Sequence, residues 1–264
     1  MKNVLVTGGA RGLGRAVTEF FAAKGVRVFS CDILDFDYEG ENIVPLKIDV
    51  RSSESVHEVF EKVSAETDKL DAVIHFAGIY RMDSYVEMTE EDFKKIMDIN
   101  LFGVYRVNKE FLPLLRNGGR VIIATSELAP LDPLPFNGIY SLSKASLDNY
   151  AQSLRIELAL LDIPVVVIRP GAFATDMIGA SDISMRALCE KTQLYKANSA
   201  KFKGIMDKVT VKALPPVKLA KLTWKAFSKK HPKYVYTKNA SFLLKLYSAM
   251  PTRIQVWAIK MLIK

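Results

Sequence analysis

Short apolar runs alternate with amphipathic stretches along most of this chain of 264 residues. Six runs are nearly continuous in Val, Ile or Leu, which is typical of strands covered on both faces of a sheet. They lie at residues 4–7, 26–31, 43–48, 71–76, 120–125 and 164–169. The stretches between them have helical periodicity, at about residues 13–24, 53–66, 90–116 and 140–161. This alternation predicts an α/β fold, with a doubly wound parallel sheet and helices on both of its faces.

The remaining segments extend this sheet, and no repeat or linker divides residues 1–264, so we expect a single domain. Weak periodicity and high polarity predict a substrate lid at about residues 176–212. Pro215-Pro216 begin a predicted helix, and KYVYT at 233–237 predicts a last strand. A lysine-rich apolar segment at about 240–264 predicts a basic amphipathic helix at the C-terminus.

Composition excludes several classes of protein. Apolar residues make up 49% of the chain, which is too many for a disordered protein. Two cysteines, Cys31 and Cys189, are too few for a disulfide scaffold, and the three isolated histidines form no structural metal site. The strand-like run that follows Met1 leaves no room for a signal peptide, and no apolar run reaches the roughly 18 residues of a membrane span. We therefore expect a cytoplasmic protein without a metal.

A glycine-rich turn, TGGARGLG at residues 7–14, joins the first predicted strand to the first predicted helix. Glycines there allow a tight turn and let the backbone approach a pyrophosphate bound at the helix N-terminus. The spacing differs from the common G-x-G-x-x-G, and a tight turn by itself requires glycine. Its place in a βαβ unit favours a nucleotide site. The candidate residues are Gly8, Arg11, Gly12, Leu13 and Gly14.

Asp32 ends the second predicted strand, 18 residues after Gly14. An acid at this offset binds the hydroxyl groups of the adenine ribose, and its charge repels the 2′-phosphate of NADP. Arg11 favours NADP instead, because a basic side chain in the turn can bind that 2′-phosphate. The Asp32 carboxylate is expected nearer to the ribose 2′ position, which distinguishes the two cofactors, so the sequence predicts NAD, with NADP as the alternative. A solvated turn residue is the other interpretation of Asp32.

Ser126, Tyr140 and Lys144 form the candidate catalytic group. Tyr140 and Lys144 are four residues apart in a predicted helix and so share one face of it. A neighbouring ammonium group favours the phenolate and lowers the pKa of a tyrosine, which is ordinarily about 10. Ser126 follows the fifth predicted strand at the sheet edge where α/β folds place their ligands, and it can orient a substrate oxygen.

The chain resembles the short-chain dehydrogenase/reductase family over nearly its whole length. The matching pieces occur in the family's order. They are TGGARGLG at 7–14, Asp49-Val50, AG at 77–78, Asn100 in NLFG, Ser126, YSLSK at 140–144 and PGAFAT at 170–175. The resemblance implies a single-domain Rossmann-type fold and an NAD(P)-dependent oxidoreductase that interconverts an alcohol and its ketone or aldehyde.

The resemblance also implies roles for individual residues. Tyr140 is the general acid/base, Lys144 binds the nicotinamide ribose and lowers the pKa of Tyr140, and Ser126 binds the substrate oxygen. Asn100 helps to hold a water molecule in a proton relay. The further cofactor contacts are Asp49 and Val50 at the adenine, Ala77 and Gly78, and Pro170, Gly171 and Thr175, the last at the carboxamide. A helix cap is the alternative interpretation of Thr175.

Two departures from the family pattern concern His75 and the loop that follows Ser126. The family writes N-N-A-G where this chain has HFAG at 75–78, so we expect His75 to be a core residue. The interval from Ser126 to Tyr140 is one residue longer than usual, and it contains three prolines that a loop can accommodate.

Two segments, at 135–147 and 214–236, resemble the steroid- and retinol-dehydrogenase branch, which implies a lipophilic substrate. Two other functions stay open. One is an NADP-dependent carbonyl reductase. The other is a nucleotide-sensing protein that keeps the fold without turnover, although a sensor has no need of the Tyr140–Lys144 pair.

The C-terminal third of the chain is strongly basic. Residues 201–264 contain 15 Lys or Arg and one acid, Asp207, whereas the chain as a whole carries a net charge of +8. In the predicted C-terminal helix, Arg253, Lys260 and Lys264 form a narrow basic stripe beside a wide apolar face. Packing on the protein itself or on a second subunit is the favoured interpretation, and docking on anionic lipid is the alternative. The basic residues lack the arrangement of a nucleic-acid site. The resemblance suggests a homodimer or homotetramer, formed through the predicted helices at 90–116 and 140–161.

Overall fold

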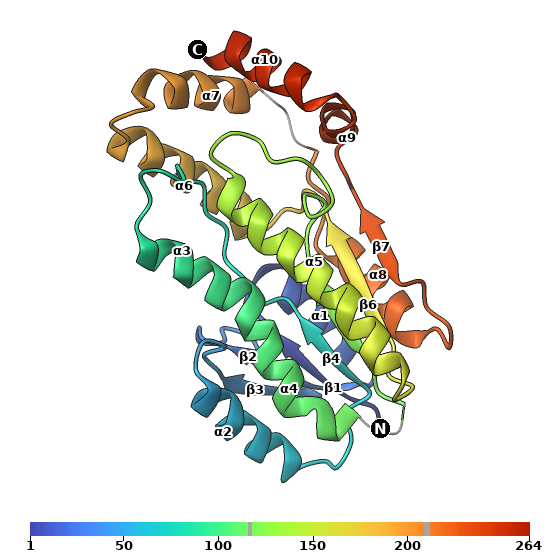
Figure 1. The fold of residues 1–264 in the computed structure, drawn as a ribbon. Coiled ribbons are helices and arrows are strands. Elements are labelled where there is room, and N and C mark those ends of the chain that lie inside the picture. The colour runs from blue at the N-terminus through green and yellow to red at the C-terminus, as the bar shows by residue number, and fades with distance from the viewer. Residues whose placement is uncertain (116–117, 209–211) are drawn as a thin grey trace.

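A seven-stranded parallel sheet forms the centre of the computed structural model, which describes residues 1–115, 118–208 and 212–264 (Figure 1). Its strand order is β3-β2-β1-β4-β5-β6-β7. The strands are β1 Asn3–Thr7, β2 Arg27–Asp32, β3 Ile43–Lys47, β4 Ala72–His75, β5 Val121–Ala124, β6 Val165–Pro170 and β7 Val235–Lys238. The predicted fold class is confirmed, and each strand lies within or overlaps a predicted run.

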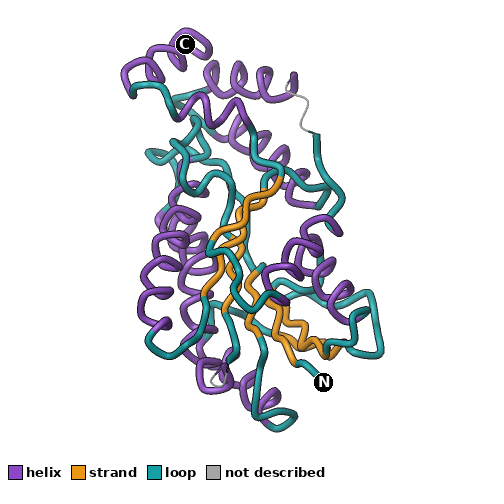
Figure 2. The backbone as a smooth tube through the Cα atoms, turned by 90° about the vertical axis from the view of Figure 1, so that its right-hand side faces the viewer, coloured by secondary structure: helices purple, strands orange, loops and turns teal. Residues whose placement is uncertain are grey.

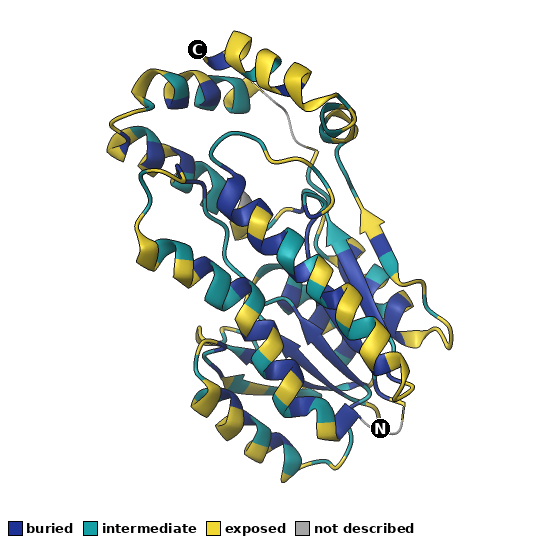
Figure 3. Ribbon diagram, in the orientation of Figure 1, coloured by how far each residue is buried: buried dark blue, intermediate teal, exposed yellow. Residues whose placement is uncertain are grey.

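Alternate side chains of each strand enter two separate hydrophobic layers, one on each face of the sheet. Leu5 packs with helices α2, α4 and α5, whereas Val4 and Val6 pack with α1 and α8. These helices are α1 Gly12–Ala22, α2 Ser53–Ser64, α4 Gly103–Leu115, α5 Gly138–Ala159 and α8 Val217–Ser228. Figure 3 shows the resulting burial of the central strands. Covering on both faces explains why the strands read as continuous apolar runs.

Four further helices gather beyond the carboxyl ends of the strands, at the top of Figures 1 and 2. They are α6 Asp176–Lys191, α7 Lys196–Lys208, α9 Phe242–Ser248 and α10 Thr252–Ile263. The proposed lid at 176–212 thus contains two helices, although residues 209–211 lie outside the described part. Within the described residues, no helix combines the length and the apolar character that crossing a membrane requires.

Two predicted helices are interrupted in the structure. The segment predicted as one helix at 90–116 consists of α3 Glu90–Met97, a π-helical turn η1 Asp98–Phe102, and α4. Residue 116, the last of that prediction, lies outside the described residues. The segment predicted as one helix at about 240–264 divides into α9 and α10 at Pro251. Proline lacks a backbone N–H and restricts the residue before it, so it ends one helix and begins the next.

Candidate active site

The glycine-rich turn lies between β1 and α1, against the end of β4. Gly8 and Gly12 have positive φ angles of 73° and 55°. A Cβ atom on Gly8 would lie 2.5 Å from the backbone nitrogen of Ala77, and one on Gly14 would lie 2.0 Å from the carbonyl oxygen of Gly8. Glycine is therefore required for close packing of the turn, independently of any ligand.

The same turn leaves the N-terminus of α1 open to an anion. Arg11 occupies the N-cap position without capping through its side chain, and the first turn of the helix contains no acid. Its N–H groups and the positive end of the helix dipole suit a pyrophosphate. Leu13 packs against the hydrophobic layer below. A cavity of about 620 Å³ lies beside the turn, with Arg11, Gly12 and Thr175 in its lining.

Asp32 closes the turn from the end of β2. One carboxylate oxygen accepts a hydrogen bond from the N–H of Ala10 at 3.0 Å, and the other accepts from the N–H of Leu34 at 3.0 Å. A carboxylate has about four acceptor positions, so both oxygens can still accept from ribose hydroxyl groups. Asp32 is thus more than a solvated turn residue, because it joins the turn to its own strand.

Ser126 and Tyr140 are both buried, and the Ser126 side chain lies close enough to Tyr140 to influence its pKa. Ser126 follows β5, and its hydroxyl oxygen also accepts from the N–H of Leu128 at 3.2 Å. Burial raises the pKa of Tyr140, and the Ser126 side chain opposes that rise. The loop between β5 and α5 therefore accommodates the extra residue while keeping Ser126 and Tyr140 close together.

Lys144 lies one helical turn beyond Tyr140, with its ammonium nitrogen 5.9 Å from the centre of the tyrosine ring. This nitrogen donates to the carbonyl oxygen of Ala124 at 3.3 Å. Burial lowers the pKa of Lys144 from 10.5 to about 8. The ammonium group has further N–H donors, which can bind the hydroxyl groups of a ribose. In the protein alone, burial rather than Lys144 dominates the pKa of Tyr140, so the predicted lowering of that pKa depends on a bound nicotinamide.

Asn100 lies in the π-helical turn and braces the loop after β4. Its amide oxygen accepts from the N–H of Ile79 at 2.8 Å, and its amide nitrogen donates to the carbonyl oxygen of Ile79 and to Ser143. A Cβ atom on Gly78 would lie 3.2 Å from the Asn100 amide oxygen and 3.5 Å from the Lys144 nitrogen. Ala77 and Gly78 thus bring the loop close to both side chains. Because the amide is occupied in this way, its direct role is to position the loop, and the water relay stays a prediction.

The other predicted cofactor residues lie at the same edge of the sheet. Asp49, after β3, binds Arg51 through both carboxylate oxygens, and this contact lowers the pKa of Asp49. Val50 is buried next to Gly103. Both lie on the β2–β3 side of the sheet, where a cofactor's adenine must lie if Asp32 binds its ribose.

Pro170, Gly171 and Thr175 surround the end of β6. A Cβ atom on Gly171 would lie 2.0 Å from the carbonyl oxygen of Asn239, so glycine is needed there. Thr175 occupies the N-cap position of α6 but makes no side-chain capping bond, and it packs 3.5 Å from the Cβ position of Gly12. Its hydroxyl group donates to the carbonyl oxygen of Phe173 at 3.5 Å, and its oxygen can still accept a hydrogen bond from a ligand beside the glycine-rich turn.

Two residues near Tyr140 were not identified from the sequence. The ring of Tyr80 lies 4.6 Å from the ring of Tyr140, centre to centre. Glu127 is half-buried after Ser126 and accepts a hydrogen bond from the N–H of Ser241, and burial raises its pKa. Phe136 has a positive φ of 62°, an uncommon conformation for a bulky residue. Only the position of Glu127 next to Ser126 gave a signal in the sequence.

His75 is buried at the end of β4, as predicted for a core residue. One ring nitrogen is paired with the amide oxygen of Asn108 at 2.8 Å, and the other has no partner among the described atoms. Burial lowers the pKa of His75 to about 4, so the ring is neutral near pH 7.

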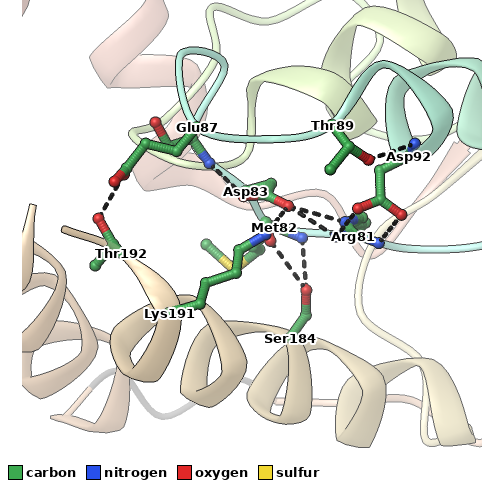
Figure 4. A network of polar contacts seen from close by, with 10 residues as sticks. Arg81, Met82, Asp83, Glu87, Thr89, Asp92, Ser184, Lys191 and Thr192 are labelled. Atoms are coloured by element: carbon green, nitrogen blue, oxygen red, sulfur yellow. Dashed lines mark hydrogen bonds and ion pairs between the residues drawn. The ribbon is translucent and has the colours of Figure 1, made fainter. Parts of the chain in front are cut away.

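A polar network fastens α6 to the loop after β4 (Figure 4). The side chain of Asp83 is completely buried and forms ion pairs with Arg81 and Lys191. On the same loop, the N–H of Met82 donates to the hydroxyl oxygen of Ser184 at 2.8 Å. The first helix of the proposed lid is therefore held beside the loop that carries Tyr80.

The family model described as short chain dehydrogenase matches residues 2–184. The chain belongs to the short-chain dehydrogenase family. It is therefore an NAD(P)-dependent oxidoreductase. A 3-oxoacyl-[acyl-carrier-protein] reductase, FabG of Escherichia coli (strain K12), is 33% identical over 197 residues, which cover 70% of this chain and 79% of that protein.

Other relatives bear different names. The 3-ketodihydrosphingosine reductase of Bacteroides thetaiotaomicron is 27% identical over 232 residues, covering 88% of this chain and 85% of that protein. Estradiol 17-beta-dehydrogenase 2 of Mus musculus is 32% identical over 194 residues, covering 69% of this chain and 51% of that protein. Membership of the family is thus confirmed. The relatives include FabG-type reductases as well as an estradiol dehydrogenase, so they do not single out the predicted steroid branch.

Solved structures show the same fold. The 3-ketoacyl-(acyl-carrier-protein) reductase of Brucella melitensis, complexed with NADH, has a TM-score of 0.72 and 19% identity, covering 89% of this chain and 96% of that chain. The alcohol dehydrogenase of Thermococcus sibiricus, complexed with 5-hydroxy-NADP, has a TM-score of 0.71 and 22% identity, covering 92% of this chain and 97% of that chain.

Proposed function

We propose that this protein interconverts a lipophilic alcohol and its ketone or aldehyde, with Tyr140 as general acid/base and NAD as the preferred cofactor. The burial of Ser126 and Tyr140, with the Lys144 ammonium nitrogen 5.9 Å from the centre of the Tyr140 ring, is the observation that carries the proposal. In reduction, the Tyr140 hydroxyl donates its proton to the substrate oxygen and becomes the phenolate, and in oxidation the phenolate takes the proton of the substrate alcohol. Ser126 holds the same oxygen. The bound nicotinamide supplies or accepts the hydride.

Lys144 acts on this proton transfer in two ways. Its ammonium group binds the ribose next to the nicotinamide, and its charge favours the phenolate form of Tyr140. Because burial alone raises the pKa of Tyr140, a nearby positive charge is required for proton exchange near neutral pH. Asn100 fixes the loop of Ala77 and Gly78 against this group, and we propose that it also helps to hold a relay water molecule.

The preference for NAD rests on Asp32. Its carboxylate stands at the end of β2 beside the glycine-rich turn, where a 2′-phosphate would meet a negative charge. Asp32→Ala should weaken NADH binding by about 10- to 100-fold, since a hydrogen bond to a charged group contributes about 1.5–3 kcal/mol, and should affect NADPH less. Cofactor titrations measure both affinities. Asp35→Ala is the matched control, because Asp35 is an exposed acid of the same loop paired with Lys47. Tighter NADPH binding by the unmodified protein would favour the NADP-dependent carbonyl reductase.

A mostly apolar cavity supports a lipophilic substrate. Its volume is about 670 Å³, and it lies between the loop before α5, the start of α7 and α10. The apolar residues that line it include Tyr85, Leu134, Phe136, Tyr195, Ile259 and Ile263. Gly138, two residues before Tyr140, also lines it. We assign the apolar part of the substrate to this cavity, and a screen of hydroxysteroids, retinoids and short secondary alcohols for NADH production tests the assignment.

Tyr140→Phe separates an enzyme from a nucleotide-sensing protein. The substitution removes the transferable proton and retains the ring, so we expect turnover to fall about 10²- to 10⁴-fold while cofactor affinity changes little. Steady-state kinetics with a substrate from the screen and cofactor titration measure the two effects. Unchanged turnover in the variant would assign the proton transfer to another group. A wild-type protein that binds cofactor and turns over no compound of the screen would favour the sensor.

A further inference from the structure

Helices α9 and α10 lie beyond the carboxyl ends of the strands and are largely exposed (Figure 3). None of the seven residues of α9 is buried. We call the exposed apolar side chains the C-terminal face: Phe242, Leu243 and Leu246 of α9 and Ile254, Val256, Trp257, Met261 and Leu262 of α10. Phe242 is 76% exposed, Met261 70% and Trp257 63%. Monomeric soluble proteins rarely expose so many large apolar side chains together, which marks the face as an interaction site.

The opposite side of α10 is firmly attached to the protein. Gln255 is buried and donates to the Asp132 carboxylate and to the Met250 carbonyl oxygen, both at 2.8 Å. Ile263 is buried in a cluster with residues of α6 and α7, and its carbonyl oxygen accepts from Asn198 at 2.8 Å. The packing of α10 on its own domain, favoured by the sequence, therefore accounts for its inner side only. The outer side chains are left uncovered.

Basic residues border the apolar part of α10. Ile254, Trp257 and Met261, spaced three and four residues apart, form one exposed stripe. The exposed Arg253, Lys260 and Lys264 form a second stripe along its edge, and Lys245 adds an exposed cation on α9. No acid follows Asp207 in the sequence, and the acids that contact this region, Asp132 and Glu127, lie on its inner side beside Gln255 and Ser241.

We propose that the C-terminal face docks on a membrane surface that contains anionic lipid. Apolar side chains with a cationic border are the features of a helix that lies in the lipid interface, where each Lys or Arg near the surface contributes about 1 kcal/mol. A second copy of the face is a poor partner, because pairing would bring two sets of four cations together. Docking would also place the cavity that Val256 and Lys260 help to line next to the lipid. That consequence alone rests on the proposed function.

Vesicle binding by the full chain tests docking. Cosedimentation compares vesicles of phosphatidylcholine with vesicles in which about a third is phosphatidylserine. We expect at least tenfold stronger binding to the anionic vesicles, and a loss of about fivefold for each of Lys260→Gln and Lys264→Gln, which corresponds to about 1 kcal/mol per charge. The emission of Trp257 should shift to shorter wavelength in a Trp224→Phe variant that leaves it as the one tryptophan.

A pair of double variants separates docking from a general effect of charge. Trp257→Glu with Met261→Glu should abolish binding. Leu160→Glu with Leu161→Glu makes the same change of charge at the exposed end of α5, far from α10 in Figure 1, and should bind as the unmodified protein does. Circular dichroism checks that both variants fold.

Three results would overturn the proposal. The first is equal recovery of the protein with neutral and anionic vesicles, and the second is undiminished vesicle binding by the Trp257/Met261 variant. The third is that the unmodified protein binds no vesicles while the Trp257/Met261 variant differs from it in oligomeric state. The last result would assign the face to a second copy of the chain.

Discussion

Lys144 has a cost for stability that follows from its burial. The folded protein holds this side chain with a pKa of about 8, against 10.5 when it is free in water. The unfolded chain therefore binds the proton more tightly, and at pH 7 the difference opposes folding by roughly 3 kcal/mol. A residue needed for binding and proton transfer can thus destabilise the protein that carries it.

Lys144→Met should consequently raise the free energy of unfolding at pH 7 by about 2 kcal/mol while it removes activity. The estimate allows about 1 kcal/mol for the lost hydrogen bond to Ala124. The advantage should be complete below pH 8 and shrink as the pH rises toward 10.5, where the unfolded lysine also loses its proton. Urea unfolding across this pH range measures it, with Lys109→Met, on the exposed side of α4, as the control. If Lys144→Met were less stable than the unmodified protein at pH 7, the charge of Lys144 would be well compensated in the folded protein.

Secondary-structure elements whose signals are local in the sequence could be predicted. The strands are recognisable because burial on both faces selects continuous apolar runs, and the glycine-rich turn and the Tyr140–Lys144 spacing each lie within a few residues. The π-helical turn around Asn100 was not predicted, because helical periodicity continues on both sides of it. Such turns are frequent at functional sites, and here the turn brings Asn100 against Ile79.

Contacts between distant segments could not be predicted. Glu127 meets Ser241 across 114 positions, and Lys191 meets Asp83 across 108 positions. No pattern within one stretch of sequence contains such pairs. The conformation of Phe136 could not be predicted from the sequence either. Its positive φ occurs where its ring packs against the rings of Tyr195 and Phe202, which lie far away in the sequence.

The attachment of α6 should depend on Asp83. Asp83→Ala leaves Lys191 without its buried partner and Arg81 with Asp92 alone, so we expect a loss of about 3 kcal/mol in the free energy of unfolding. We also expect faster proteolysis in the segment at 176–212. Chemical denaturation and limited proteolysis measure the two effects.

Asp182→Ala provides the matched control for this substitution. Asp182 also lies on α6, but its pair with Arg186 is exposed, so its loss should cost less than about 1 kcal/mol. Equal effects of the two substitutions would mean that burial of Asp83 does not determine the attachment of the helix.

At the scale of the whole molecule, large apolar side chains are exposed at several places, and two groups of them lie on separate helical surfaces. The C-terminal face lies beyond the carboxyl ends of the strands, whereas Phe102, Tyr105 and Leu142 are about half exposed on η1, α4 and α5, which cover one face of the sheet. The second surface coincides with the helices from which the sequence predicts a homodimer or homotetramer. Its charges are mixed, since Arg106 lies 5.9 Å from the centre of the Phe102 ring and is paired with Asp98, so apolar burial between two copies meets less repulsion there.

We therefore expect self-association through α4 and α5. Light scattering of the purified protein should give a mass of two or four times 29.6 kDa, and Tyr105→Glu with Leu142→Glu should reduce it, because two carboxylates would be buried without partners. Ile183→Glu, at an exposed position on α6, is the control and should leave the mass unchanged. The Trp257/Met261 variant should also keep the mass of the unmodified protein, since docking and self-association use different surfaces. A monomeric unmodified protein would contradict the prediction, and loss of association in the Trp257/Met261 variant would move the subunit contact to α10.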